Sequence, residues 1–256
     1  MRVKLLASIA GSDSQHQALT TFLVNDRVAV DAGSLGFALA PEEMAGIRDV
    51  IITHTHADHT ASLPIFVAEA FVSLTSPITI HGTTEVVAAL RQFIFNDQMW
   101  PDFELIPLGD GSGPSLRFRE IKPGVTSEIG GLQITPVQVN HVVPTVGLLM
   151  GDGRASVGFT SDTYVTDEFW RAAEARDDLR AVYVDVSYPS EMRELAAASK
   201  HLTPELLAGE LQKLNRRDVD VLAVHIKPTN RGKVIAQLAN LDPPVAAAEI
   251  GRTYEW

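Results

Sequence analysis

The sequence predicts an α+β protein in which two β-sheets pack face to face and helices cover their outer sides. Three observations lead to this prediction. Short apolar runs alternate with amphipathic segments through all 256 residues. Strands joined by hairpins dominate the first half, whereas strands and helices alternate in the second half. No shift in composition marks an internal boundary, so residues 1–256 are expected to form a single domain.

In the first half, short apolar runs bounded by turn residues predict strands, and longer amphipathic runs predict helices. The expected strands are Val3–Ser8, Thr21–Val24, Val28–Asp31, Val50–Thr53, Ile78–His81 and Leu116–Glu120. The expected helices are Leu63–Leu74 and Thr84–Phe95. Residues 100–131 contain many Gly and Pro, so they are expected to form loops around a short hairpin.

The second half alternates strands with helices that have recognisable start signals. The expected strands are Leu132–Val139, Val146–Met150, Ser156–Thr160, Ala181–Val186, Val221–Val224 and Val245–Ala248. The expected helices are Thr166–Ala175, Pro204–Leu214 and Asn230–Leu238. Thr203 is expected to be the N-cap of the middle helix, because proline at the next position favours a helix start.

The charge of the chain limits its partners. The sequence has 32 acidic and 21 basic residues, which gives a net charge of −11 with histidine neutral. Nucleic acid is densely negative, so we expect no nucleic-acid partner, although metal ions in a site would still attract a small anionic substrate. No apolar run approaches the ~18 residues that a membrane helix needs, so we expect no membrane partner and a cytoplasmic location.

Four residues of metal-ligand type follow the strand expected at Val50–Thr53, namely His54, His56, Asp58 and His59. Without a bound ion, the crowding of these four side chains would be unfavourable in electrostatics and in packing. A divalent cation removes this cost. The chain has no cysteine, so a metal must be bound by His and carboxylate. Four ligands in one loop are too crowded for one tetrahedral ion. We therefore expect His54 and His56 to face one metal and Asp58 and His59 a second.

Each metal then needs ligands from elsewhere, and three candidates stand where apolar strands end. These are His141 after Ile134–Asn140, Asp162 after Ser156–Ser161, and His225 after Asp220–Val224. A lone histidine at a strand end is more often a structural or surface residue, but the cluster at His54–His59 favours metal binding. Asp162 is expected to bridge both metals. Zinc is the expected metal, with manganese or iron as alternatives.

The segment Thr53-His-Thr-His-Ala-Asp-His59 resembles the hallmark of the metallo-β-lactamase superfamily. The block Asp31-Ala-Gly33 and the three distant ligand candidates follow in that superfamily's order and approximate spacing, and the resemblance covers nearly the whole chain. It implies a four-layer αββα sandwich with the metals at one edge between the sheets. It also implies that Asp31 supports the ligand loop, for which the simpler interpretation is a capped strand end.

Further blocks resemble the class II cyclic-nucleotide phosphodiesterases. His59-Thr-Ala-Ser-Leu-Pro64 is similar to that family's signature, which usually has Leu where this chain has Ala57. Phe95–Phe103 is similar to the family's Asn-Asp…Trp-Pro segment. His201-Leu-Thr-Pro204 and His225-Ile-Lys-Pro228 resemble two later blocks, and the first of these also resembles the tRNA 3′-end-processing nucleases.

On this resemblance, Asn96, Trp100 and Lys227 are candidate substrate contacts, and His201 is a candidate general acid or phosphate-orienting residue. A histidine titrates in the range that lets it protonate a departing alkoxide. The simpler interpretations are a core-covering Trp100, a surface Lys227 and an exposed His201 at the start of a helix.

The reaction that the resemblance implies is hydrolysis of 3′,5′-cyclic nucleotides, cyclic AMP or cyclic GMP, to 5′-nucleoside monophosphates. Two divalent ions would neutralise the phosphate oxygens and supply a metal-bound hydroxide, which Asp58 would orient. The alternatives are another phosphodiesterase, a lactonase or thioesterase with the same metals, and a metal-dependent binding protein without turnover. The complete ligand set disfavours the last of these. The sequence leaves the native metal, the preferred base and a homodimer open.

Overall fold

A computed structural model of the protein describes residues 1–8 and 17–256. The chain divides into two compact units, each with its own sheet. The N-terminal unit comprises Arg2–Lys122 and Ile250–Glu255, and the C-terminal unit comprises Pro123–Glu249 with Met1 and Trp256. Among the helices of the described residues, none has both the length and the apolar character needed to cross a membrane.

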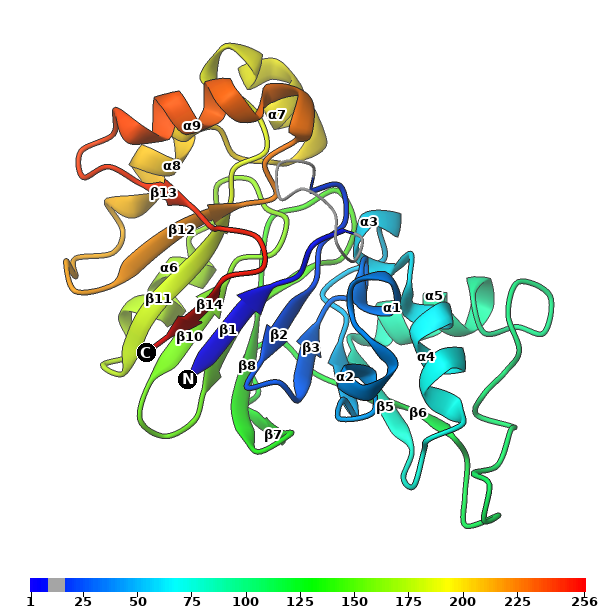
Figure 1. Ribbon diagram of the computed structural model, residues 1–256. Coiled ribbons are helices and arrows are strands. Elements are labelled where there is room, and N and C mark those ends of the chain that lie inside the picture. Colours follow the sequence, from blue (N-terminus) through cyan, green and yellow to red (C-terminus); the bar gives the residue numbers. More distant parts are fainter. Residues whose placement is uncertain (9–16) are drawn as a thin grey trace. The chain divides into compact units, whose positions relative to one another are not determined.

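The sheet of the N-terminal unit combines an antiparallel and a parallel half. In the described residues it has seven strands in the order β14-β1-β2-β3-β4-β5-β6 (Figure 1). Pairing is antiparallel from β14 to β3 and parallel from β3 to β6, so the carboxyl ends of β3 to β6 share one edge. The strands are β1 (Arg2–Leu5), β2 (Phe22–Val24), β3 (Val28–Val30), β4 (Asp49–Ile51), β5 (Ile78–Gly82), β6 (Leu116–Glu120) and β14 (Thr253–Glu255).

Helices cover one face of this sheet. They are α1 (Leu35–Ala38), α2 (Pro41–Met44), α3 (Ala57–Thr60), α4 (Leu63–Phe71) and α5 (Thr84–Phe93). Leu35 of α1, Phe66 of α4 and Leu90 of α5 are buried in one apolar cluster with Ile80 of β5. The Thr83 hydroxyl caps the first turn of α5. Burial of these apolar side chains fixes β4 and the loop that follows it.

The sheet of the C-terminal unit is also mixed. Its described residues form seven strands in the order β13-β12-β11-β10-β9-β8-β7 (Figure 1). Pairing is antiparallel from β7 to β10 and parallel from β10 to β13, so the carboxyl ends of β8, β10, β11 and β12 share one edge. The strands are β7 (Ser127–Ile129), β8 (Leu132–Gln138), β9 (Val146–Gly151), β10 (Ser156–Phe159), β11 (Leu179–Asp185), β12 (Asp220–Val224) and β13 (Ala246–Ala247).

Helices also pack on this second sheet. Trp170 of α6, Leu207 of α8 and Val234 of α9 are buried in a cluster with Val182 of β11. The helix α8 starts with a proline and is capped by the Thr203 hydroxyl, as predicted. The helices are α6 (Glu168–Glu174), α7 (Arg193–Ser199), α8 (Pro204–Leu211) and α9 (Arg231–Ala239), with 3₁₀ turns η1 (Ser190–Met192) and η2 (Pro228–Asn230).

The predicted α+β fold with two sheets and flanking helices is confirmed, with differences in short elements. The hairpin expected in residues 100–131 is reduced to an antiparallel bridge between Pro107 and Pro114. The same stretch contains β7, which pairs with β8 across Gly130 and Gly131, both at positive φ. The helices α1, α2 and α3 were not predicted, because four residues are too few for a helical apolar pattern.

Candidate functional site

The loop after β4 carries the four clustered ligand candidates of the N-terminal unit. His56 is the N-cap of α3, so His54 and His56 lie between strand and helix as the sequence predicted. Asp58 and His59 lie inside α3, a short helix where a loop was expected. His54 and His59 are buried, and the ring of His54 has its centroid 4.8 Å from that of His56 and 4.1 Å from that of His59.

Asp31, which follows β3, orients two of these histidines. Its carboxylate accepts hydrogen bonds from the Thr53 backbone N–H at 2.8 Å and from the Thr53 hydroxyl at 2.9 Å. It also lies 2.7 Å from His59 Nδ1, so this nitrogen carries the proton and Nε2 carries the lone pair. The Thr53 hydroxyl donates to Asp31, so it accepts from His54 Nδ1 at 3.1 Å, and His54 also presents Nε2.

Gly33 lets the chain after β3 approach the ligand loop closely. A Cβ atom at Gly33 would lie 2.0 Å from the Asp58 carbonyl oxygen and 2.8 Å from the Thr20 backbone nitrogen. The Thr20 N–H donates to that same Asp58 carbonyl at 2.8 Å, and the Ala32 N–H donates to the His59 carbonyl at 2.7 Å. These backbone hydrogen bonds leave no space for a side chain at Gly33.

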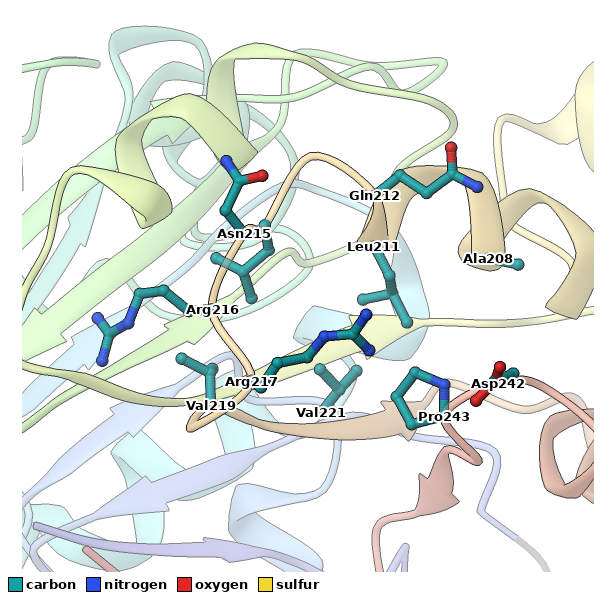
Figure 2. Close-up of a pocket in the computed structure, with 11 residues that line it drawn as sticks. Ala208, Leu211, Gln212, Asn215, Arg216, Arg217, Val219, Val221, Asp242 and Pro243 are labelled. Atoms are coloured by element: carbon teal, nitrogen blue, oxygen red, sulfur yellow. The ribbon is translucent and has the colours of Figure 1, made fainter.

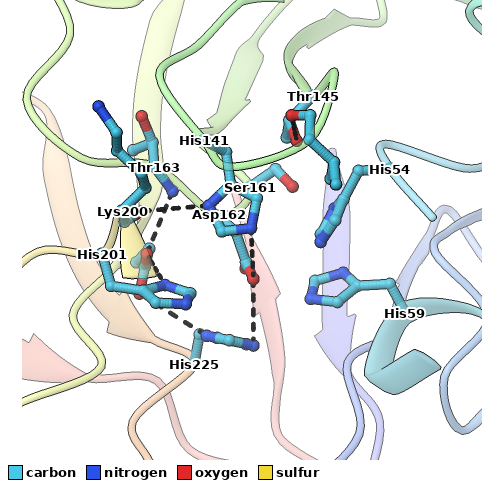
Figure 3. A network of polar contacts seen from close by, with 12 residues as sticks. His54, His59, His141, Thr145, Ser161, Asp162, Thr163, Lys200, His201 and His225 are labelled. Atoms are coloured by element: carbon cyan, nitrogen blue, oxygen red, sulfur yellow. Dashed lines mark hydrogen bonds and ion pairs between the residues drawn. The ribbon is translucent and has the colours of Figure 1, made fainter. Parts of the chain in front are cut away.

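In the C-terminal unit, the distant candidates lie at the shared edge of strand ends. His141 follows β8, Asp162 follows β10 and His225 directly follows β12. The predicted strand-end positions are therefore confirmed. Because those carboxyl ends share one edge, side chains that are far apart in sequence gather there (Figure 3).

Asp162 lies within reach of two histidines. Its Oδ2 is 3.5 Å from His225 Nε2 and 3.9 Å from His141 Nε2, and all three side chains are almost fully buried. Two ligand atoms on one tetrahedral zinc ion, with bonds of about 2.0–2.1 Å, are separated by about 3.4 Å. These distances place the Asp162 carboxylate near enough to both histidines to share an ion with them, and its bridging role stays a prediction.

Asp185, the last residue of β11, is a buried carboxylate that was not among the predicted site residues. Its Oδ2 lies 2.7 Å from His201 Nδ1 and accepts a hydrogen bond from the Thr163 N–H at 3.1 Å. Its Oδ1 accepts from the Ser187 hydroxyl at 2.8 Å. Burial raises the pKa of Asp185, but the charge of His201 and hydrogen bonds from His201 and His225 outweigh burial and lower the pKa to about 2. Asp185 is therefore an ionised acceptor.

Asp185 also determines which nitrogens of two histidines face outward. His201 donates from Nδ1 to Asp185 and presents Nε2. The Ser187 hydroxyl donates to Asp185 and accepts from His225 Nδ1 at 3.0 Å, so His225 presents Nε2 as well. The His201 ring lies 5.3 Å from that of His225 and 5.1 Å from that of His141 (Figure 3). His201 is 6% exposed, which excludes the simpler interpretation of an exposed residue.

A sequence signal for Asp185 exists. It is the one charged residue of the strand expected at Ala181–Val186, and it stands near the end of an apolar run. The same pattern, a residue of metal-ligand type at the end of an apolar run, indicated Asp162 and His225. The signal is weaker for Asp185 because the residue precedes the last apolar position of the run.

The three candidate substrate contacts lie in two places. The Asn96 Oδ1 accepts hydrogen bonds from two backbone N–H groups of its own turn, and Trp100 packs against the apolar cluster of the N-terminal unit. In the C-terminal unit, Lys227 Nζ lies 3.3 Å from His225 Nε2, so Lys227 lies beside a ligand candidate. The contacts of Asn96 and Trp100 organise the loop that holds them, and substrate contact by all three residues stays a prediction.

Left-handed backbone is concentrated at these clusters. In the described part of the chain, four residues of the clusters have positive φ: Asp31 (60°), Ser161 (54°), Lys200 (60°) and His225 (59°). This conformation costs roughly 1–2 kcal/mol in residues other than glycine. Such strain persists only where surrounding contacts hold it, and it is common at functional sites.

The donor set of each unit fits divalent metal ions. Contacts at Nδ1 leave Nε2 as the lone-pair nitrogen in His54, His59, His141 and His225. Histidines that bind metals usually donate the other ring N–H to a carboxylate or a carbonyl in this way. In the C-terminal unit, Asp162, Asp185, His201 and His225 offer ligand atoms within 4.8 Å of one another. Clusters of this kind are consistent with a dinuclear metal site.

A cavity of about 430 Å³ in the C-terminal unit does not belong to this cluster (Figure 2). It is formed by the end of α8, the following loop to β12, and the turn at Asp242 and Pro243. Arg217 and Asp242 bring opposite charges to it, and none of the predicted site residues lines it. The candidate functional site is therefore formed by the His/Asp clusters at the strand ends and not by this cavity.

Two mixed sheets flanked by helices, with His/Asp clusters at strand ends, define the metallo-β-lactamase type of fold. The chain is similar in structure to the metallo-β-lactamase fold protein YhfI from Bacillus subtilis, with a TM-score of 0.78, 16% identity and 99% of both chains covered. It is similar to unliganded yeast PDE1, with a TM-score of 0.79, 18% identity and 98% of both chains covered. These likenesses confirm the predicted fold class.

A family model described as "Beta-lactamase superfamily domain" matches residues 26–226, and the chain belongs to this family. It is 26% identical over 208 residues to a probable 3′,5′-cyclic-nucleotide phosphodiesterase of Yersinia pestis, covering 72% of this chain and 58% of that protein. It is 28% identical over 109 residues to a ribonuclease Z of Pseudomonas putida, covering 43% and 31%. The chain thus spans less than two thirds of the length of these curated relatives.

Proposed function

We propose that the chain is a dinuclear metal-dependent phosphodiesterase that hydrolyses 3′,5′-cyclic nucleotides to 5′-nucleoside monophosphates. Zinc is the expected metal. The proposed ligands are the seven strand-end and loop residues predicted from the sequence: His54, His56, Asp58, His59, His141, Asp162 and His225. Two divalent ions supply positive charge for the phosphate oxygens and lower the pKa of bound water.

The observation that carries the proposal is the buried pair of Asp185 and His201. Cleavage of a cyclic nucleotide must release a sugar alkoxide, which is a poor leaving group near neutral pH. The bond of 2.7 Å between Asp185 and His201 Nδ1 fixes the orientation of the ring, with Nε2 turned away from Asp185. His201 Nε2 would then deliver a proton to the departing oxygen. Its ring lies 5.3 Å from that of His225, which supports a place beside the proposed metals.

Lys227 adds a positive charge beside the same cluster. Its ammonium lies 3.3 Å from His225 Nε2, the atom proposed to bind an ion. The positive charge of this ammonium would attract an anionic phosphodiester oxygen more strongly than the neutral carbonyl oxygen of a lactone.

A second phosphodiester substrate, the 3′ region of a precursor tRNA, is favoured by the similarity to a ribonuclease Z over 109 residues. The net charge of −11 opposes it, because RNA binding depends on neutralising phosphates with basic side chains. The similarity to the Yersinia protein also extends further, over 208 residues. Cyclic nucleotides are therefore the preferred substrates.

The test is a substrate panel on zinc-loaded and manganese-loaded protein, with elemental analysis of the same samples. The panel contains cyclic AMP, cyclic GMP, 2′,3′-cyclic nucleotides, a bis-aryl phosphate, a precursor tRNA, a homoserine lactone and a glutathione thioester. We expect about two metal ions per chain. We also expect turnover of 3′,5′-cyclic nucleotides with release of 5′-monophosphates. Lactone or thioester hydrolysis without cleavage of any diester would overturn the proposal.

A further inference from the structure

Lys200 stands between α7 and His201 in a backbone conformation that lysine disfavours. It is the C-cap of α7 with φ 60° and ψ 51°. A left-handed lysine costs roughly 1–2 kcal/mol relative to its ordinary conformations, whereas glycine adopts this region readily. Contacts of Lys200 must therefore stabilise the conformation.

The backbone carbonyl of Lys200 orients a predicted metal ligand. Its oxygen lies 3.1 Å from His141 Nδ1, and a carbonyl only accepts hydrogen bonds, so Nδ1 carries the proton. His141 then presents Nε2, which lies 3.9 Å from Asp162 Oδ2. The left-handed turn at Lys200 aims this carbonyl at His141 and directs the next residue, His201, toward Asp185.

The side chain of Lys200 makes a second link to the same place. Its ammonium donates to Asn140 Oδ1 at 3.0 Å and lies 5.8 Å from the centre of the Tyr164 ring. Asn140 is itself held, because its side-chain amide donates to the Val165 carbonyl at 3.0 Å. Asn140 directly precedes His141, and Lys200 directly precedes His201. The contact between Lys200 and Asn140 thus links the residue before His201 to the residue before His141. These two histidines have different proposed roles.

We propose that Lys200 is a positioning residue that sets both the metal affinity of His141 and the proton delivery of His201. The proposed effect on proton delivery by His201 rests on the proposed function. The proposed effect on metal affinity requires only that His141 binds a metal. The side-chain contact with Asn140 holds the left-handed turn, and the turn holds both histidines. The direction of the effect distinguishes positioning from charge. Removing a cation near a metal site would by itself raise the affinity for a metal cation, whereas loss of positioning lowers it.

The experiment compares three variants in the full chain. Lys200→Met removes the ammonium and keeps the apolar stem, Lys200→Gly also relieves the backbone, and Lys200→Arg keeps a charged donor. Zinc affinity is measured by competition with a chelator, and unfolding of the metal-free protein is measured by heat. Asp26→Gly is the matched control, because Asp26 is left-handed at φ 56° and makes an exposed ion pair with Arg2.

We expect Lys200→Met and Lys200→Gly to bind zinc about 10-fold more weakly, at the lower end of the range for residues that orient metal ligands. Lys200→Arg should restore most of the affinity. The metal-free Lys200→Gly protein should be at least as stable as the parent, so the loss of affinity cannot be a general loss of fold. Asp26→Gly should leave zinc affinity unchanged. Unchanged or higher zinc affinity in Lys200→Met would overturn the proposal.

The proposed effect on proton delivery by His201 is tested with two diesters that differ in leaving group. Lys200→Met should slow cleavage of an alkyl leaving group more than cleavage of a nitrophenyl group, which needs little protonation. Equal slowing on both substrates would overturn the link to His201. If the parent cleaves no diester, the proposed function fails, while the zinc measurements still decide the link to His141.

Discussion

In each of the two units, a buried aspartate carboxylate orients a histidine through a hydrogen bond from its Nδ1. In the N-terminal unit, His59 belongs to a short loop-helix segment and donates from Nδ1 to Asp31 at 2.7 Å. In the C-terminal unit, His201 donates from Nδ1 to Asp185 at the same distance. The first pair joins Asp31, which follows β3, to the short helix α3, which comes after the neighbouring strand β4. The second pair belongs to a network that gathers side chains from several separate strand ends.

The difference teaches that one contact can serve two chemical purposes. Asp31 orients His59, which is a proposed metal ligand, so its loss should weaken metal binding. Asp185 orients His201, which is not among the proposed ligands, and it also holds the proposed ligand His225 through the Ser187 hydroxyl. Loss of the His201 side chain should therefore slow the reaction with the metals in place, and four predictions test this separation of metal binding from proton delivery.

The largest effect is expected for Gly33→Ala, which breaks the N-terminal side of the comparison. A Cβ at 2.0 Å from the Asp58 carbonyl oxygen forces the backbone apart, and we expect a loss of more than about 3 kcal/mol in the free energy of unfolding. Metal content should fall with it. Gly209→Ala in α8 is the control, because nothing lies within 4 Å of its Cβ. The control should stabilise by about 0.5–1 kcal/mol. Parental stability and metal content in Gly33→Ala would refute the steric argument.

Asp162→Ala should have the next largest effect. A bridging carboxylate serves both ions, so the variant should lose occupancy at both positions rather than at one. Elemental analysis after dialysis against buffer with a matched zinc concentration gives the measurement. A variant that keeps two ions per chain would show that Asp162 is not a bridge.

His201→Ala should then separate rate from metal binding. This variant should keep the metals and lose about 10²–10⁴-fold in rate on diesters with an alkyl leaving group. The loss should be much smaller with a nitrophenyl leaving group. Asp185→Asn should lose rate in the same way and should also bind metal more weakly, because Asp185 holds His225 through the Ser187 hydroxyl. His81→Ala is a matched control, because His81 Nε2 pairs with Asp49 Oδ1 at 2.8 Å outside the ligand loop. Equal losses on both leaving groups would favour an orienting role for His201 instead of an acid.

The smallest effect is expected for Asp31→Asn. The amide oxygen still accepts from Thr53 but holds the His59 ring less strongly, so metal affinity should fall about 10–100-fold. Chelator competition measures this, with Asp49→Asn as a control that should leave affinity unchanged. An Asp31→Asn variant that binds metal normally but reacts slowly would reverse the roles assigned to the two carboxylates.

The sequence predicts the N-terminal cluster better than the C-terminal one for a physical reason. His54, His56, Asp58 and His59 are close in the sequence, so their proximity in space follows from the chain itself. His141, Asp162 and His225 were predicted only from their places at strand ends, which a shared sheet edge brings together.

Asp185 and Lys200 show what the sequence could not supply. The importance of Asp185 depends on a 2.7 Å contact with His201, and no local pattern encodes a contact between residues of different strands and loops. The role inferred for Lys200 depends on its backbone conformation, which neighbouring residue types do not indicate. Short helices such as α1 and α3 also escape prediction, because tertiary contacts rather than periodic patterns stabilise them.

The left-handed residues around the clusters have a consequence for how such a chain evolves. Selection for thermal stability alone would favour glycine at these positions, because glycine removes roughly 1–2 kcal/mol of backbone cost at each. Ser161 is open to that exchange, whereas Asp31, Lys200 and His225 would lose the side chains on which the clusters depend. A lineage drifting toward heat tolerance would therefore fix glycine first at Ser161.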